Sequence, residues 1–286
     1  MLWLTALIWG FAFVAQRAGM EHIGPFMFNG LRFLLGSLSL IPLIMFIRRK
    51  EVSGSFSGDL VKGGVAAGLV LFTAASLQQA GMVYTTAGKA GFITGLYVVL
   101  VPLIGLFIGQ KTGKNLWIGA IIAVCGLFLL TFSGKMLIGK GDLLVLLSAF
   151  FWAVHVQLIN KLVKKLPALP LSSFQFAVCG IMSLAASFVF ETTHYENVRM
   201  AAIPLLYGGL LSVGVAYTLQ VVAQRHVHPA YASIILSFET VFAAIGGWLI
   251  LSESFTTRNL AGCLLMLAGI VVVQVRDIRF KNTTQV

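Results

Sequence analysis

Residues 229–273 constrain the fold more than any other stretch, because two long apolar segments are separated there only by a short polar turn at 252–259. A helix needs about 20 apolar residues to cross a bilayer at a rise of ~1.5 Å per residue, and each segment reaches that length. Lipid offers no partner for an unpaired backbone group, so such segments are expected to span the membrane as helices.

The same pattern runs through the whole chain. Hydrophobic residues make up 58% of it, charged residues 10%, and the mean hydropathy is +0.95, whereas about a quarter of a soluble domain is charged. The sequence therefore predicts an all-α integral membrane protein with ten transmembrane helices. These are expected at residues 2–20, 25–47, 61–83, 87–108, 115–133, 142–161, 171–190, 201–223, 229–251 and 257–275. The first segment lacks the basic start of a signal peptide and is expected to be retained.

An internal repeat with a constant offset of 143 residues organises these segments. Residues of the same type recur at this offset: Gly119 and Gly262, Gly126 and Gly269, Trp9 and Trp152, and Phe33 and Phe176. We expect two homologous five-helix halves, residues 1–143 and 144–286. Because five is an odd number, the second half would be inverted in the membrane, which is typical of secondary transporters.

The net charge of +11 comes from basic residues scattered among short loops. With the N-terminus inside, more of them fall on the inner side than on the outer side, so both termini are predicted to be cytoplasmic. This distribution explains the charge without a nucleic-acid partner, and none is expected.

Glu239 is the first candidate for a functional residue, because it lies near the middle of the apolar segment 229–251. A carboxylate at that depth costs several kcal/mol unless it is partnered, protonated or next to a wet cavity. Ala243 and Gly246 follow it at i+4 and i+7, so its helical face is small and can border a cavity. Proton coupling or amine binding is one interpretation, and a hydrogen bond that fixes helix packing is the other.

His155 is the second candidate, on one helical face with Ser148 and Trp152. Histidine changes its protonation near neutral pH, so it can couple transport to protons, or it can serve as a fixed hydrogen-bonding residue. No second His, Cys or carboxylate stands at ligand spacing beside it, so neither a metal site nor a bound cofactor is predicted.

Aromatic and amide side chains complete the candidate site. Aromatic walls with a few polar groups suit a small organic ligand, although ordinary helix packing is the alternative for each residue. Unpaired amides are costly in lipid, so the glutamines are expected to line a cavity or to bond neighbouring helices. The predicted cavity residues are Trp9, Phe13, Gln78, Tyr97, Trp152, His155, Tyr217, Gln220 and Glu239. Arg32 is interpreted as reaching the membrane interface, with carboxylate binding as the less favoured alternative.

Three stretches then resemble a known family: LIWGFAFVAQRAG at 7–19, NGLRFLLGSL at 29–38 and SFETVFAAIGGWLILSESFTTRNLAGCLLMLAG at 237–269. They are similar to the drug/metabolite transporter superfamily and, within it, to the bacterial EamA-like family. The resemblance implies two inverted five-helix repeats, a bacterial inner membrane, and alternating access to a central cavity. One departure is Thr240, where the family often has proline after the glutamate, and it puts the local helix geometry in question.

The sequence thus predicts a secondary active transporter, and an exporter in particular, of a small polar or amphipathic metabolite such as an amino acid. Proton coupling through Glu239 or His155 is a hypothesis, and a homodimer is an open alternative to a monomer. A non-transporting scaffold or sensor would instead have a sealed interface between the halves. An intramembrane enzyme would need several catalytic groups at one depth, and the chain offers only these two.

Overall fold

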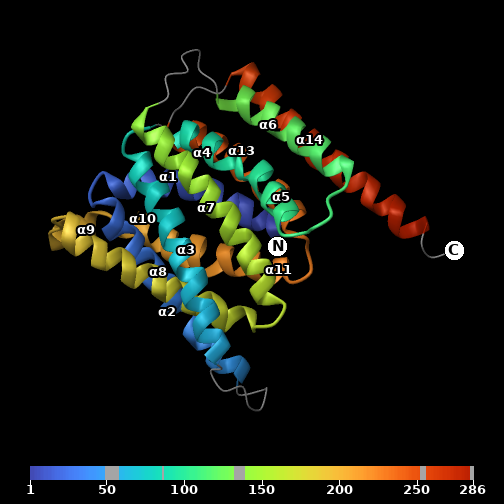
Figure 1. Ribbon diagram of the computed structural model, residues 1–286. Helices are drawn as coiled ribbons and strands as arrows, with labels where there is room; N and C mark the ends of the chain where they lie inside the picture. The colour runs from blue at the N-terminus through green and yellow to red at the C-terminus, as the bar shows by residue number, and fades with distance from the viewer. Residues whose placement is uncertain (49–57, 86, 132–138, 252–255, 284–286) are drawn as a thin grey trace.

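The computed structural model describes residues 1–48, 58–85, 87–131, 139–251 and 256–283, and within them it contains helices and no strand. The helices in chain order are α1 (Leu2–Met20), α2 (Pro25–Arg48), α3 (Gly58–Met82), α4 (Ala87–Gly95), α5 (Tyr97–Phe107), α6 (Lys114–Thr131), α7 (Lys140–Val163), α8 (Ala168–Phe190), α9 (Tyr195–Met200), α10 (Ala202–Leu206), η1 (Tyr207–Tyr217), α11 (Thr218–Gln224), α12 (Pro229–Leu236), α13 (Glu239–Leu251) and α14 (Thr257–Thr283). Figure 1 shows them as a bundle in which α6 and α14 run side by side.

Eight segments of the described chain are long and apolar enough to cross a membrane. The predicted fifth and tenth spans correspond to α6 and α14, whose apolar stretches are shorter, Lys114–Leu129 and Thr257–Val272. The protein is therefore a multi-pass helical membrane protein, while ten spanning helices in an inverted repeat stay a prediction.

Helices that the 143-residue offset pairs also pack against each other, α2 against α8 and α6 against α14. Glycines bring α6 and α14 together, because they allow two helix backbones to approach closely. A Cβ on Gly126 would lie 2.7 Å from the carbonyl oxygen of Gly262, and one on Gly269 would lie 2.7 Å from that of Gly119. Since Gly119 pairs with Gly262 and Gly126 with Gly269, the two contacts are reciprocal, as they are across a two-fold axis.

Two of the predicted spans are interrupted. The span predicted at 87–108 breaks at Leu96, between α4 and α5, and the span at 229–251 breaks at Ser237 and Phe238, between α12 and α13. The amides of Thr240 and Val241 bond the carbonyls three residues earlier, at 3.1 and 3.0 Å, so the helix tightens locally. Glu239 is the first residue of α13, so the break lies beside Thr240, the residue that put the local helix geometry in question.

Small residues follow Glu239 on α13. Ala243 and Gly246 are not among the residues that line the cavity beside Glu239; they pack against α1, where a Cβ on Gly246 would lie 3.1 Å from Phe11. At Gly10 the two backbones come closer still, since a Cβ there would lie 2.7 Å from the carbonyl oxygen of Glu239. The small residues on both helices therefore hold α1 against the start of α13.

Candidate functional site

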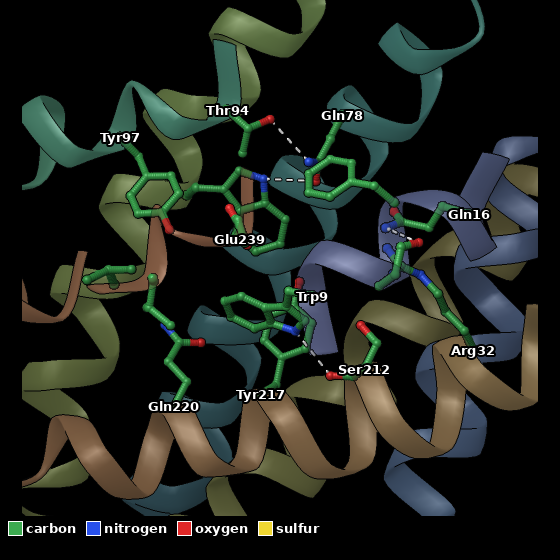
Figure 2. A pocket seen from close by; sticks show the side chains of 15 residues that line it. Trp9, Gln16, Arg32, Gln78, Thr94, Tyr97, Ser212, Tyr217, Gln220 and Glu239 are labelled. Atoms are coloured by element: carbon green, nitrogen blue, oxygen red, sulfur yellow. Dashed lines mark hydrogen bonds between the residues drawn. The ribbon is translucent and has the colours of Figure 1, made fainter. Parts of the chain in front are cut away.

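A cavity lies between the helices of both halves, and eight of the nine predicted cavity residues line it (Figure 2). These eight are Trp9, Phe13, Gln78, Tyr97, Trp152, Tyr217, Gln220 and Glu239. Seven further residues line it as well: Ala12, Gln16, Arg32, Thr94, Val156, Ser212 and Leu236. His155 is the predicted residue that is not among them.

Hydrogen bonds hold the two tryptophans of the cavity in fixed orientations. The Trp9 indole N–H donates to the carbonyl oxygen of Ser212 at 3.2 Å, and that of Trp152 donates to Gln78 Oε1 at 3.1 Å. Gln78 in turn donates from Nε2 to the Thr94 hydroxyl at 3.2 Å. A buried indole normally finds such a partner, and here both bonds cross from one half of the chain to the other.

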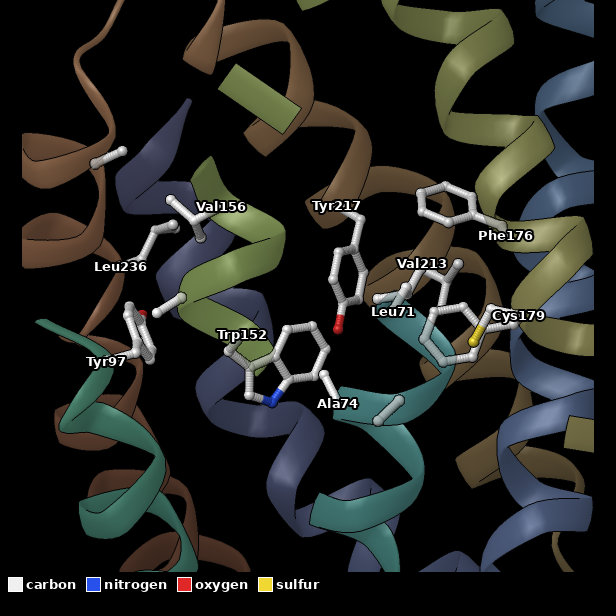
Figure 3. Close-up of a cluster of buried hydrophobic side chains, with 14 of the residues drawn as sticks. Leu71, Ala74, Tyr97, Trp152, Val156, Phe176, Cys179, Val213, Tyr217 and Leu236 are labelled. Atoms are coloured by element: carbon white, nitrogen blue, oxygen red, sulfur yellow. The ribbon is translucent and has the colours of Figure 1, made fainter. Parts of the chain in front are cut away.

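Tyr217 connects the cavity to the apolar core of the bundle. Its ring centre lies 4.4 Å from Trp9, 6.0 Å from Trp152 and 5.8 Å from Phe176. Figure 3 shows Tyr217 within this cluster, close to Trp152 and with Phe176 on its other side. These aromatic contacts build a stiff wall across the middle of the cavity.

A polar atom without a partner lies at the end of the cavity that holds Glu239. Gln220 Oε1 is buried and has no hydrogen bond in the described residues, while the buried Tyr97 hydroxyl lies against the Glu239 carboxyl group. Glu239 itself is only 5% exposed. Unpaired buried polar groups cost about 1–3 kcal/mol each, so this end of the cavity is prepared to bind water or a polar ligand.

His155 lies behind the cavity wall instead of in it. It is completely buried, its Nε2 and Gln175 Oε1 form a hydrogen bond of 2.8 Å, and its ring centre lies 6.0 Å from that of Trp152. In this structure it supports the tryptophan that lines the cavity.

Four polar or charged lining residues were not among the predicted cavity residues: Gln16, Arg32, Thr94 and Ser212. Gln16 follows Trp9 at i+7 and Phe13 at i+3, so the helical period could have placed Gln16 on the same face as those two aromatic residues. Arg32 was expected at the membrane interface, but it is only 2% exposed and lines the cavity. No pattern in the sequence shows that Arg32 points inward, because α2 has apolar residues on all of its faces.

Other polar residues behave as structural elements. Gln224 donates to the carbonyl oxygen of Val156 at 3.1 Å and therefore ties α11 to α7. Gln79 is completely buried and does not line the cavity. Within the described residues, no three His, Cys, Asp or Glu side chains are placed to hold a metal ion together. Glu253 belongs to the stretch 237–269 that resembles the EamA-like family, and it lies outside the described residues.

Comparisons with known proteins show to which family a chain with this architecture belongs. The model of the EamA-like transporter family matches residues 1–132 and 139–275. The chain belongs to the EamA-like transporter family. The resemblance of this sequence to the EamA-like branch of the drug/metabolite transporters is therefore confirmed.

Relatives of this EamA-like protein are named as transporters. An uncharacterized transporter of Archaeoglobus fulgidus is 31% identical, over 96% of this chain and 84% of its own. The transporter YoaV of Bacillus subtilis is 30% identical, over 93% and 92% of the two chains. A probable amino-acid metabolite efflux pump of Salmonella typhimurium is 24% identical, over 99% and 96%. One crystal structure shares the fold with a TM-score of 0.80 at 16% identity, over 98% of this chain and 97% of the other.

Proposed function

We propose that this EamA-like transporter is a secondary active exporter of a small polar or amphipathic metabolite, such as an amino acid, that works by alternating access. The observation that carries the proposal is the cavity itself, which aromatic and polar side chains from both halves line around a buried carboxyl group. A sealed interface would have favoured a scaffold or sensor. Support for the substrate class comes from the Salmonella typhimurium relative, whose name refers to amino-acid metabolite efflux.

Glu239 is proposed as the residue that couples transport to protons. It is the first residue of the half-helix α13, directly after the break at Ser237 and Phe238. Broken helices whose half-helix ends face a midplane site are typical of secondary transporters. A carboxyl group there can be neutral with a proton or charged against a substrate cation, and it changes between these states when the cavity changes sides. His155, outside the cavity, is the second candidate for this role.

The membrane arrangement belongs to the same proposal. We place the protein in a bacterial inner membrane with both termini in the cytoplasm, on the basis of the basic residues in its loops. Reporter enzymes fused to either terminus test this orientation, because a cytoplasmic reporter remains active only on the inner side. A homodimer is compatible with the proposal, but the mechanism does not need one, since one chain lines the whole cavity.

The test is flux in proteoliposomes that contain the purified protein, with a panel of labelled amino acids and related metabolites. We expect accumulation of one chemical class that increases when a pH gradient is imposed, and loss of the gradient effect in Glu239→Gln. Unchanged pH dependence in both Glu239→Gln and His155→Ala would rule out proton coupling. No flux of any compound, with protein shown to be folded, would contradict the transporter itself.

A further inference from the structure

We propose that Arg32 forms an anion subsite in the cavity, which holds an oxyanion such as a carboxylate of the substrate. The inference rests on the proposed transport function and adds to it the charge that a substrate must carry. It follows from three observations: Arg32 is buried, it has no counter-ion among the described residues, and Glu239 lies at the other end of the cavity.

Arg32 is a buried cation without an acidic partner. It is 2% exposed, and its one hydrogen bond within the described chain runs from Nε to Asn29 Oδ1 at 2.9 Å. No carboxylate lies within ion-pair distance of it in the described residues. Arginine stays protonated in proteins, and a buried charge without a partner costs several kcal/mol. The guanidinium therefore needs an anion or ordered water in the cavity.

The contacts of Arg32 leave its terminal nitrogens available on the cavity side. Asn29 occupies Nε, and the guanidinium lies over the ring of Phe33 at 4.8 Å and near that of Phe28 at 5.7 Å. These contacts fix the plane of the guanidinium without neutralising its charge. A planar guanidinium whose two terminal nitrogens are available matches the two oxygens of a carboxylate in a bidentate pair.

Polar groups around Arg32 extend this end of the cavity. Gln16 donates from Nε2 to the carbonyl oxygen of Ala12 at 3.0 Å, while its Oε1 is buried and has no partner. Figure 2 shows Gln16 and Arg32 together on one side of the cavity and Glu239 with Tyr97 on the other. The cavity therefore has a cationic end and an acidic end.

Tyr217 separates the two ends. It lines the cavity within electrostatic range of both Arg32 and Glu239, and its ring packs against Trp9. Arg32 and Glu239 do not form an ion pair with each other. A ligand with an anionic group at Arg32 and an apolar body against the aromatic wall would satisfy the cation that the fold leaves uncompensated.

The experiment compares three probes that share the branched apolar chain of leucine. They are leucine itself, 4-methylpentanoate, which lacks the amino group, and isopentylamine, which lacks the carboxylate. Binding to the full chain in lipid nanodiscs is followed by tryptophan fluorescence, since Trp9 and Trp152 line the cavity. We expect both carboxylates to bind more tightly than isopentylamine. In Arg32→Gln their dissociation constants should rise at least tenfold, and in Arg32→Lys, which keeps the charge without the planar fork, they should rise less.

The matched control is Arg17→Gln, which removes an exposed arginine on α1 and should leave all three affinities unchanged. Equal binding of the carboxylates to wild type and to Arg32→Gln would overturn the subsite, as would tighter binding of isopentylamine, or no saturable binding of either carboxylate. Folding is checked by circular dichroism in every variant, and Arg32→Lys keeps the test decisive if Arg32→Gln is poorly folded.

Flux separates this inference from the proposed function. A protein that moves an amine or an uncharged compound equally well with and without Arg32 keeps the transport function and overturns the anion subsite. A protein that binds carboxylates through Arg32 but moves no compound of the panel keeps the subsite and overturns transport.

Discussion

Helices α1 and α7 occupy positions paired by the 143-residue offset, yet they contribute differently to the cavity. Trp9 and Trp152 are a matched pair, and both line it. One turn further on, α1 has Ala12, which lines the cavity, where α7 has His155, which is buried behind its wall. The paired position therefore borders open space on α1, at Ala12, and is filled by a hydrogen-bonded imidazole ring on α7, at His155.

The difference continues along both helices and their neighbours. Gln16 on α1 lines the cavity, whereas its counterpart Ile159 belongs to an apolar cluster. Arg32 on α2 has no acidic partner among the described residues, whereas its counterpart Gln175 is bonded to His155. At these three positions the α1 half therefore keeps open or polar cavity wall where the second half is filled, although Trp152 and Val156 of α7 still line the cavity. The two halves share a scaffold and contribute unequally to one binding surface.

The largest effect is expected from moving the α7 residue into α1. Ala12→His places an imidazole ring where the cavity now has a methyl group, and the ring should fill the space between Trp9 and Gln16. We expect flux in proteoliposomes to fall at least tenfold while the protein still folds, because overpacking at one site costs about 1–3 kcal/mol.

Ala12→Ser serves as the control, since it adds a single oxygen and should keep more than half of the flux. Full activity of Ala12→His would mean that the space beside Ala12 is not on the transport route, and the contrast between α1 and α7 would lose its functional meaning.

Sequence reasoning identified the helices and most of the cavity wall for a physical reason. Apolar length marks spanning segments, and helical period places residues such as Trp9 and Phe13 on one face. Thr240 put the helix geometry near Glu239 in question, but the sequence could not place the break, because residues 237 and 238 are Ser and Phe and neither glycine nor proline marks it. It also could not give the direction of Arg32, since that depends on how α2 is rotated against its neighbours.

A second prediction concerns the close contact of α1 with α13 at Gly10, whose counterpart on α7 is Ala153. In Gly10→Ala, the new Cβ would lie 2.3 Å from Phe242 Cβ and 2.7 Å from the Glu239 carbonyl oxygen. Alanine stabilises a helix by up to about 1 kcal/mol relative to glycine. That gain is opposed here, because the carbonyl oxygen of Glu239 is a backbone atom and the clash with it can be relieved only if the two helices move apart.

We therefore expect Gly10→Ala to lower the midpoint of thermal unfolding by several degrees and to reduce flux. Gly91→Ala is the matched control, because its Cβ would meet only Thr240 Cγ2 at an ordinary 3.5 Å. That variant should be as stable as wild type or slightly more stable. Equal stability of both variants would show that α1 is not held against the start of α13 in solution.

The smallest effect on transport is expected at His155, the α7 residue outside the cavity. His155→Ala leaves Gln175 Oε1 buried without its 2.8 Å partner, which should lower the free energy of unfolding by about 1–3 kcal/mol. Replacing both partners with apolar residues removes that unpaired group, so His155→Leu combined with Gln175→Leu should recover much of the loss.

Flux per folded molecule should stay within about twofold of wild type in both variants, and its pH dependence should persist because Glu239 is unchanged. Loss of the pH dependence in His155→Ala, with the protein folded, would instead make the α7 side the coupling side and reverse the assignment of roles to the two helices.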